Sequence, residues 1–170
     1  RVRRQRQMCI RDRSTVSMVL CGMFAALVAI GAFIQIPVPY MDYFTLQFFF
    51  VLLAGLILGA DKGAISVGCY VLLGLVGVPI FAAGGGIGYI FRPSFGYLVG
   101  FIVSAYVTGK VCEKLKASYK NYLLACLAGF VVTYAIGIVY KFIILNFYAH
   151  TPATLGVIFL SCFPLDLSLI

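Results

Sequence analysis

The chain has 170 residues, of which 63% are hydrophobic and only 11% are charged. A soluble domain is about half apolar and about a quarter charged, so this composition excludes a soluble globular protein and indicates an integral membrane protein. The length fits one helical bundle of about five or six spans of roughly twenty residues each. The formal net charge of +8 comes largely from arginines in residues 1–14, and no basic stripe on a soluble face favours nucleic-acid binding.

Residues 1–14 differ from everything that follows, because their arginines are opposed only by Asp12. The segment is too polar for the core of a signal peptide, and R-Q-R-Q-M-C-I-R-D-R resembles translated adapter sequence. We therefore expect a foreign or non-native leader, followed by a single membrane domain over residues 15–170. The alternative is a genuine positively charged cytoplasmic tail.

The first predicted span runs from Val16 to Ile36 and ends at two prolines. Small residues recur along it at four-residue spacing, which places a smooth strip on one helix face where another helix can approach closely. The strip is either an internal packing face or a docking face for a separate membrane protein. The residues of this predicted docking strip are Gly22, Ala25, Ala26 and Ala29.

The second predicted span opens with T-L-Q-F-F-F, and the third runs from Gly63 to Val78 after a tight turn at Asp61 and Lys62. Thr45 and Gln47 lie near the mouth of the second span. Because a buried amide in lipid must find a partner, Gln47 either bonds to a neighbouring helix or faces a binding site.

The fourth predicted span ends near Gly109, and the fifth, from Tyr122 to Phe147, carries Lys141 in its last third. Lysine and arginine gather in the leader, in the Asp61–Lys62 turn and in residues 110–120. The positive-inside rule places these segments on the cytoplasmic side, so the segment between the third and fourth spans faces outward.

That outward segment, Pro79 to Tyr97, holds four glycines within five residues, one arginine and several aromatic residues. A solvated linker would be rich in Ser, Asn and Lys instead. Irregular backbone at membrane depth is tolerated where protein or a water-filled pocket satisfies its polar groups. We therefore interpret this segment as one wall of a site for a small anionic ligand.

The five acidic residues all lie outside the middle of the predicted spans, so the carboxylate relay typical of proton-coupled carriers is missing. The six cysteines show no CxxC or Cys/His spacing, and no nucleotide-binding or catalytic motif is present. The sequence predicts a membrane-embedded binder with no catalytic residues, no metal site and no cofactor, which needs a partner to supply energy.

Several stretches resemble the BioY family, the biotin-specific substrate-binding subunit (S component) of energy-coupling-factor (ECF) transporters. These are A-A-L-V-A-I-G-A-F-I, I-P-V-P, T-L-Q-F-F-F-V-L-L-A-G and V-P-I-F-A-A-G-G-G-I-G-Y-I-F-R-P-S-F-G-Y-L-V-G-F. The resemblance covers roughly Val16 to Pro164. It implies an all-α, six-helix bundle that binds biotin from outside. It also implies docking, through small residues of the first helix, on a transmembrane coupling subunit driven by two ATPase subunits.

Biotin offers a carboxylate, a ureido ring and an apolar chain, and the residues that the resemblance points to match these groups. Arg92 would pair with the carboxylate or close the loop over it; its alternative is an interfacial anchor. Tyr89, Phe91 and Tyr97 would form the walls, although the tyrosines also suit an aromatic belt. Lys141 is a second candidate for the carboxylate, or it snorkels to the interface. The glycines that would let backbone approach the ligand are Gly84, Gly85, Gly86 and Gly88.

The C-terminal end departs from the family, whose P-G-D-x-x-K pattern opens the last helix. Here the line reads P-L-D-L-S-L-I, so Leu165 replaces the glycine and Leu169 stands where the lysine belongs. Only Asp166 carries over, as a partner for the ureido group. We expect about five complete spans, with the sixth span missing after its start.

The predicted function is therefore biotin capture for a primary active uptake system in the plasma membrane of a prokaryote. Two alternatives remain open at this stage. The same fold could serve another small anionic vitamin, because the loop defines an anion better than it defines biotin. The chain could also be a membrane assembly protein that binds no ligand.

Overall fold

The structure is a computed structural model, and it describes residues 2–36, 44–82, 84–115 and 118–148. The expected ureido partner Asp166 and the expected start of a sixth span lie outside the described residues. The helices are α1 (Val2–Phe33), α2 (Gln47–Leu58), α3 (Ala60–Val76), η1 (Ile87–Phe91), α4 (Phe95–Lys114), α5 (Tyr119–Ile143) and the π-helical η2 (Ile144–Tyr148). The strands are β1 (Gln35–Ile36) and β2 (Phe44–Thr45), which pair antiparallel.

The chain is a multi-pass, all-helical membrane protein. Among the described residues, three stretches are long and apolar enough to cross a bilayer by themselves, namely Thr15–Phe33, Phe95–Lys114 and Tyr119–Asn146. The helix α2 has 12 residues and is therefore about 18 Å long, shorter than the hydrocarbon core of about 30 Å. The expectation of five full-length spans is thus too generous for α2.

The chain reverses between α2 and α3 at a single residue, Gly59, whose φ of 81° lies in the range that favours glycine. The predicted turn at Asp61 and Lys62 is therefore wrong in detail, because both residues already belong to the first turn of α3. Asp61 suits that position, since a carboxylate near a helix N-terminus interacts favourably with the helix dipole.

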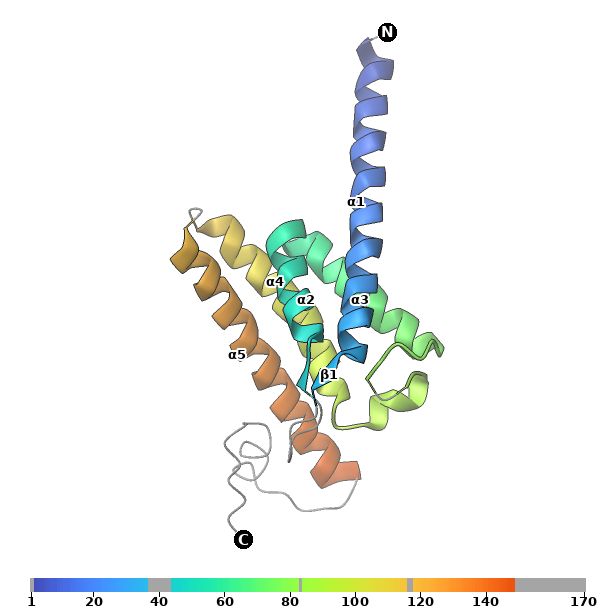
Figure 1. Cartoon of the computed structure of the whole chain (residues 1–170), viewed down its shortest axis with the longest axis vertical. Helices are drawn as coiled ribbons and strands as arrows, with labels where there is room; N and C mark the ends of the chain where they lie inside the picture. Colours follow the sequence, from blue (N-terminus) through green and yellow to red (C-terminus); the bar gives the residue numbers. More distant parts are fainter. Residues whose placement is uncertain (1, 37–43, 83, 116–117, 149–170) are drawn as a thin grey trace.

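The central helix is α4, which packs against α2, α3 and α5 (Figure 1). Small residues make these contacts close. A Cβ atom on Gly55 of α2 would lie only 2.6 Å from the Ala105 carbonyl oxygen of α4, and one on Gly100 of α4 would lie 3.0 Å from the Thr133 carbonyl oxygen of α5. Small residues therefore let the helices of the bundle approach closely, as is usual where helices associate without a hydrophobic driving force.

The predicted docking strip on α1 is divided by the structure. Ala25 is buried, at 8% exposure, and packs in the hydrophobic core, while Ala29 is half-buried. Gly22 and Ala26 are exposed. At about 100° per residue the four positions spread over roughly 100° of the helix surface, so the edge of the core runs between them. The expectation that all four residues share one face free for docking is therefore wrong for Ala25, which lies in the core.

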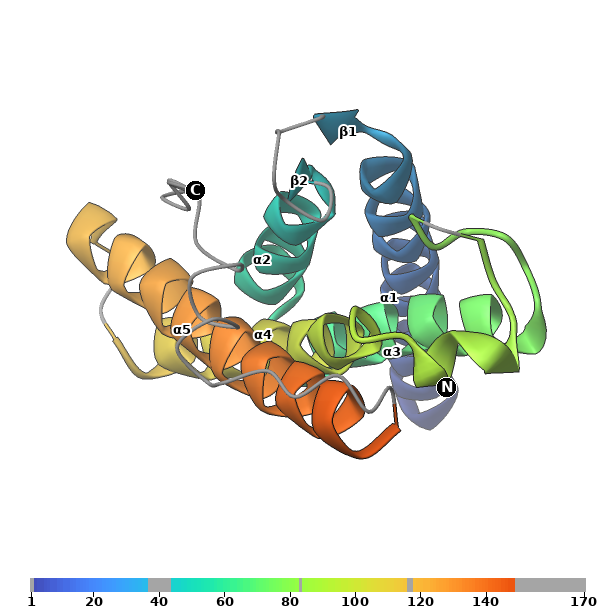
Figure 2. The same ribbon diagram turned by 90° about the horizontal axis from the view of Figure 1, so that it is seen from below.

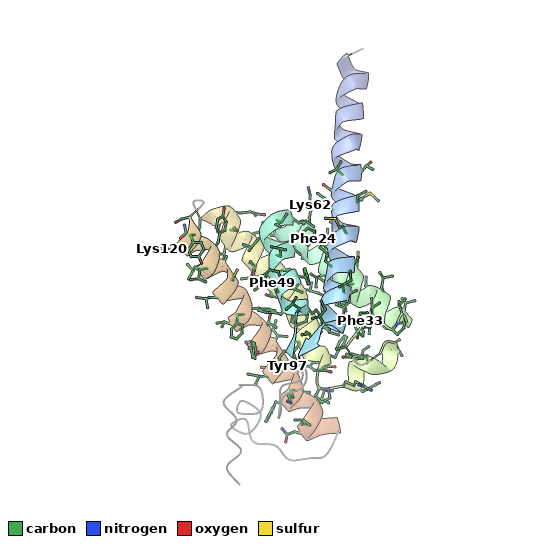
Figure 3. The ribbon with its side chains drawn as sticks, viewed as in Figure 1. Phe24, Phe33, Phe49, Lys62, Tyr97 and Lys120 are labelled. Carbon is green, nitrogen blue, oxygen red and sulfur yellow. The ribbon has the colours of Figure 1, made fainter. Side chains whose placement is uncertain are left out.

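The two ends of the bundle differ in their side chains, with lysines labelled at one end and aromatic residues at the other in Figure 3. Figure 1 shows the α2–α3 junction and the facing ends of α4 and α5 at the upper end, with β1 and the segment after α3 at the lower end. Lys62 and Lys120 lie at the upper end in Figure 3, whereas Phe33 and Tyr97 lie lower. At the basic end, Glu113 accepts hydrogen bonds from the Ala60 N–H (3.1 Å) and from Lys110 (3.3 Å). The positive-inside rule again makes this end cytoplasmic.

Candidate functional site

The glycine-rich loop, residues 77–94, begins where α3 ends. Gly77 has a φ of 118°, and its N–H bonds to the Gly74 carbonyl while the Val78 N–H bonds to the Leu73 carbonyl. This pair of bonds is a Schellman motif, which stops a helix at a residue that must adopt a left-handed conformation. The glycine at position 77 therefore fixes where the loop leaves the bundle.

The loop then folds back on itself and on α3. Phe81 and Gly84 exchange two backbone hydrogen bonds, of 2.9 and 3.1 Å, and the Gly86 N–H reaches the Gly74 carbonyl at 2.7 Å. The short helix η1 follows and leads into α4. Figure 2, seen from this end, shows the loop and the β1–β2 pair around the ends of α1 and α2. These backbone groups of the loop are thus paired, as burial at membrane depth requires.

The four glycines predicted to admit a ligand have different roles. Gly84 and Gly86 have φ values of 109° and 106°, a conformation that side chains disfavour. A Cβ atom on Gly85 would collide with the Val78 carbonyl oxygen, so this glycine is filled by the loop itself. A Cβ atom on Gly88 would meet nothing within 4 Å. Of the four glycines, only Gly88 has neither a left-handed conformation nor a clash.

A chain of aromatic rings lies behind the loop. The Phe81 ring, 2% exposed, stands 5.6 Å from the Tyr70 ring and 4.7 Å from the Tyr89 ring. Tyr89 is itself buried, at 7% exposure. Sequence reasoning named Tyr89 but missed Tyr70 and Phe81. The signal available for Tyr70 was a polar aromatic residue in the middle of an apolar span, which needs a hydrogen-bond partner when buried.

Arg92 ends this chain of rings at the surface. Its guanidinium lies 5.5 Å from the centre of the Tyr89 ring, which is cation–π geometry, and the side chain is exposed. Within the described part of the chain, the ion pair found joins Lys110 and Glu113 at the opposite end. The guanidinium therefore faces no described carboxylate and can pair with an anionic ligand at the mouth of the loop.

Gln47 begins α2 and is buried, at 4% exposure. Its side chain lies beside the Tyr70 phenol, and its backbone is pressed against Gly31 of α1, where a Cβ atom would lie 2.9 Å from Gln47 Cα. Within the described residues its Nε2 atom makes no hydrogen bond of full geometry, although the amide and the Tyr70 phenol are close enough to interact weakly. A buried amide donor without a well-formed hydrogen bond is unfavourable by about 1–3 kcal/mol, which makes Nε2 of Gln47 a candidate donor to a ligand.

The remaining predicted site residues are more scattered. Thr45 is half-buried and pairs with Gln35 in the two-stranded sheet, and Phe91 is 54% exposed. Tyr97 packs on α5, with its ring 6.0 Å from the Tyr134 ring. Lys141 is half-buried near the end of α5. The structure therefore links Gln47, Tyr89 and Arg92 through Tyr70 and Phe81, and it does not gather the other candidates around them.

Comparison with known proteins gives a consistent set of relatives. The chain matches the BioY family over residues 4–170. It is 41% identical over 152 residues to the "Probable biotin transporter BioY" of Lysinibacillus sphaericus, covering 89% of this chain and 77% of that protein. It is 43% identical over 134 residues to the "Biotin transporter BioY" of Thermotoga maritima, covering 78% and 76%.

A solved structure shares the fold. The crystal structure of the S-component for biotin from an ECF-type ABC transporter superposes with a TM-score of 0.76 at 24% sequence identity. The match covers 88% of this chain and 80% of that chain. At this identity the likeness concerns the arrangement of helices.

Proposed function

Because this chain belongs to the BioY family, we propose that it is the biotin-binding membrane subunit of an ECF-type vitamin uptake transporter. The observation that carries this proposal is a series of contacts that begins at Arg92, at the outer mouth of the loop. It continues through the rings of Tyr89, Phe81 and Tyr70 and ends at Gln47, at the start of α2. A cation at one end and an unpaired amide donor at the other suit a ligand with a carboxylate and a distant carbonyl group.

In this arrangement Arg92 pairs with the biotin carboxylate. A guanidinium offers a planar fork of donors that matches a carboxylate with two parallel hydrogen bonds. Gln47 donates from Nε2 to the ureido carbonyl, and the Tyr89 ring lies against the Arg92 guanidinium. Asp166 as a second ureido partner and Lys141 as a second carboxylate partner remain part of the proposal. They rest on the residue types alone.

Binding of radiolabelled biotin to detergent-purified protein tests the proposal directly. We expect the parent to bind at submicromolar concentration and Arg92→Ala to bind roughly 10-fold more weakly or worse, because a hydrogen bond to a charged group is worth about 1.5–3 kcal/mol. Arg92→Lys keeps the charge but loses the fork, so we expect its affinity to fall between the two.

Three outcomes would contradict parts of this proposal. Tight binding of thiamine or riboflavin in place of biotin would show that the site takes another vitamin. Binding of no vitamin by the purified protein would favour an assembly role. Unchanged affinity in Arg92→Ala would leave Arg92 as an interfacial anchor, with the carboxylate bound elsewhere.

The proposed partners are a transmembrane coupling subunit and two ATPase subunits. The docking face on α1 is then the exposed pair Gly22 and Ala26, since Ala25 lies in the core. A Cβ atom on Gly22 would meet nothing within 4 Å, so this face leaves space for a second helix to approach closely.

We expect Ala26→Trp to reduce biotin uptake by cells to background while leaving biotin binding by the purified subunit unchanged, because the bulky ring holds the coupling subunit away. The matched control is Val131→Trp, at a 64% exposed position of α5, the helix that lies across the bundle from α1 in Figure 1. Uptake that persists in Ala26→Trp, or that is lost equally in both variants, would exclude this face as the docking surface.

A further inference from the structure

Two tyrosine hydroxyls hold the main chain of the glycine-rich loop from different helices. The Tyr70 hydroxyl of α3 donates to the Ile80 carbonyl at 3.0 Å. The Tyr140 hydroxyl of α5 donates to the Ile90 carbonyl. The two carbonyls bracket the segment that contains all four glycines predicted to approach the ligand. The loop is therefore fixed at both ends by side chains that are remote from it in sequence.

Both rings are themselves held in place. Tyr70 is fully buried, at 0% exposure, with its ring edge-on to Phe81 at an interplanar angle of 74°. The Tyr140 ring lies 5.8 Å from the Phe95 ring, and its Cβ atom fills the space that a side chain at Gly96 would need. Because neither ring can turn away freely, each hydroxyl defines a fixed point for the carbonyl that it holds.

Breaking either bond is unfavourable in apolar surroundings. Both bonds are partly buried, so a hydroxyl or carbonyl left without its partner costs up to about 1–3 kcal/mol, the penalty of a fully buried group. Besides the Gly86–Gly74 backbone bond, the loop must therefore lose a bond at Ile80 or at Ile90 to leave its position. Between these points lie Tyr89 and the backbone that leads to Arg92, so the two bonds also fix where the cation stands.

Tyr70 has a second neighbour of interest, since the buried Gln47 amide lies beside its phenol. The same residue thus contacts the start of α2 and holds the first half of the loop. A shift of either element alone would separate the amide of Gln47 from the rings that lead to Arg92.

We propose that Tyr70 and Tyr140 are positioning residues, which set the spacing between Gln47 and Arg92 by holding the loop at Ile80 and Ile90. Their hydroxyls are committed to carbonyl groups of the loop, so they act through the loop and not by bonding to the ligand. The effect on the ligand rests on the function proposed above, whereas the effect on the loop does not.

The test uses Tyr70→Phe and Tyr140→Phe, which remove the hydroxyls and keep the rings. The matched control is Tyr106→Phe, at an exposed position of α4 whose ring lies under Lys110. Hydrogen exchange of the ligand-free, purified protein reports on the loop, and the dissociation rate of radiolabelled biotin reports on the site. A peptide from the middle of α4 serves as an internal reference for the fold.

In each variant we expect the loop amides to exchange about 3- to 10-fold faster and biotin to dissociate about 3- to 10-fold faster. This factor corresponds to the free energy of one neutral hydrogen bond. The α4 peptide and Tyr106→Phe should remain at the parental rates. Loop exchange at the parental rate in both variants would overturn the proposal. Faster loop exchange with unchanged biotin release would also overturn it, because the loop would then be held without positioning the site.

Two further outcomes are distinguishable. If exchange rises equally in the loop and in α4 for both variants, the hydroxyls hold the whole bundle, and the specific role is wrong. If the parent itself binds no biotin while the loop alone exchanges faster, the proposed ligand is wrong and the role of the two hydroxyls in holding the loop stands.

Discussion

Replacing Gln47 with methionine is expected to weaken biotin binding by about 100-fold while leaving the ligand-free protein as stable as the parent, or more stable. Methionine has nearly the shape of glutamine, so packing in the α1–α2 contact is kept. The replacement removes a buried Nε2 donor that no described residue satisfies, which relieves a cost of about 1–3 kcal/mol. The loss of the contact with Tyr70 offsets part of that gain.

The loss of binding has the same cause, the removal of the Nε2 donor of Gln47. A site built to donate a buried hydrogen bond to its ligand loses about 2–3 kcal/mol when the donor is removed, which is roughly 30- to 150-fold in affinity. Thermal unfolding of the purified, ligand-free protein measures the first effect, and biotin titration measures the second. A melting temperature that is kept or raised, together with a lower affinity for biotin, indicates that Gln47 serves binding and not the stability of the fold.

Ser104 supplies the matched control. It lies on α4 at 0% exposure, opposite Gly129 of α5, and its hydroxyl likewise finds no partner among the described residues. Ser104→Ala should therefore keep or raise the melting temperature without any change in biotin affinity. A Gln47→Met variant that melts at a lower temperature and binds biotin normally would show that the amide is a packing group with an undetected partner.

The fold was largely accessible from the sequence because its causes are local. Long apolar runs indicate where α1, α4 and α5 lie, although α1 begins earlier than predicted, at Val2, and α4 continues past Gly109 to Lys114. The charged residues indicate which end is cytoplasmic. The ends of α2 and α3 were harder to place. A single glycine, Gly59, turns the chain, and the neighbouring charges of Asp61 and Lys62 indicated a longer turn than the one that forms.

The site was accessible only in part, since its residues are brought together by contacts that no spacing records. Composition and resemblance were enough to choose Arg92, Tyr89 and Gln47. The hydroxyls that hold the loop come from Tyr70 and Tyr140, which are 10 and 50 residues away from their acceptors. A tyrosine within an apolar span is equally compatible with lipid contact, so only the packed structure distinguishes these two from the other tyrosines.

Gly85→Ala is expected to lower the melting temperature and to weaken biotin binding about 10-fold. The added methyl group would collide with the Val78 carbonyl oxygen and lie 2.8 Å from the Val78 carbonyl carbon. Both are backbone atoms next to Gly77, where the loop leaves α3, so neither can turn aside as a side chain would. Forcing an extra group into such a contact costs about 1–3 kcal/mol, and the loop must shift away from α3 to accept it.

Gly88→Ala tests the same argument within the same loop. A Cβ atom there meets nothing within 4 Å, and no left-handed conformation is required, so we expect this variant to melt at the parental temperature. Any loss of biotin binding by Gly88→Ala would then report a ligand lying against that residue. If Gly85→Ala melts and binds as Gly88→Ala does, the loop adapts to the methyl group, and the close contact with Val78 does not determine where Tyr89 and Arg92 stand.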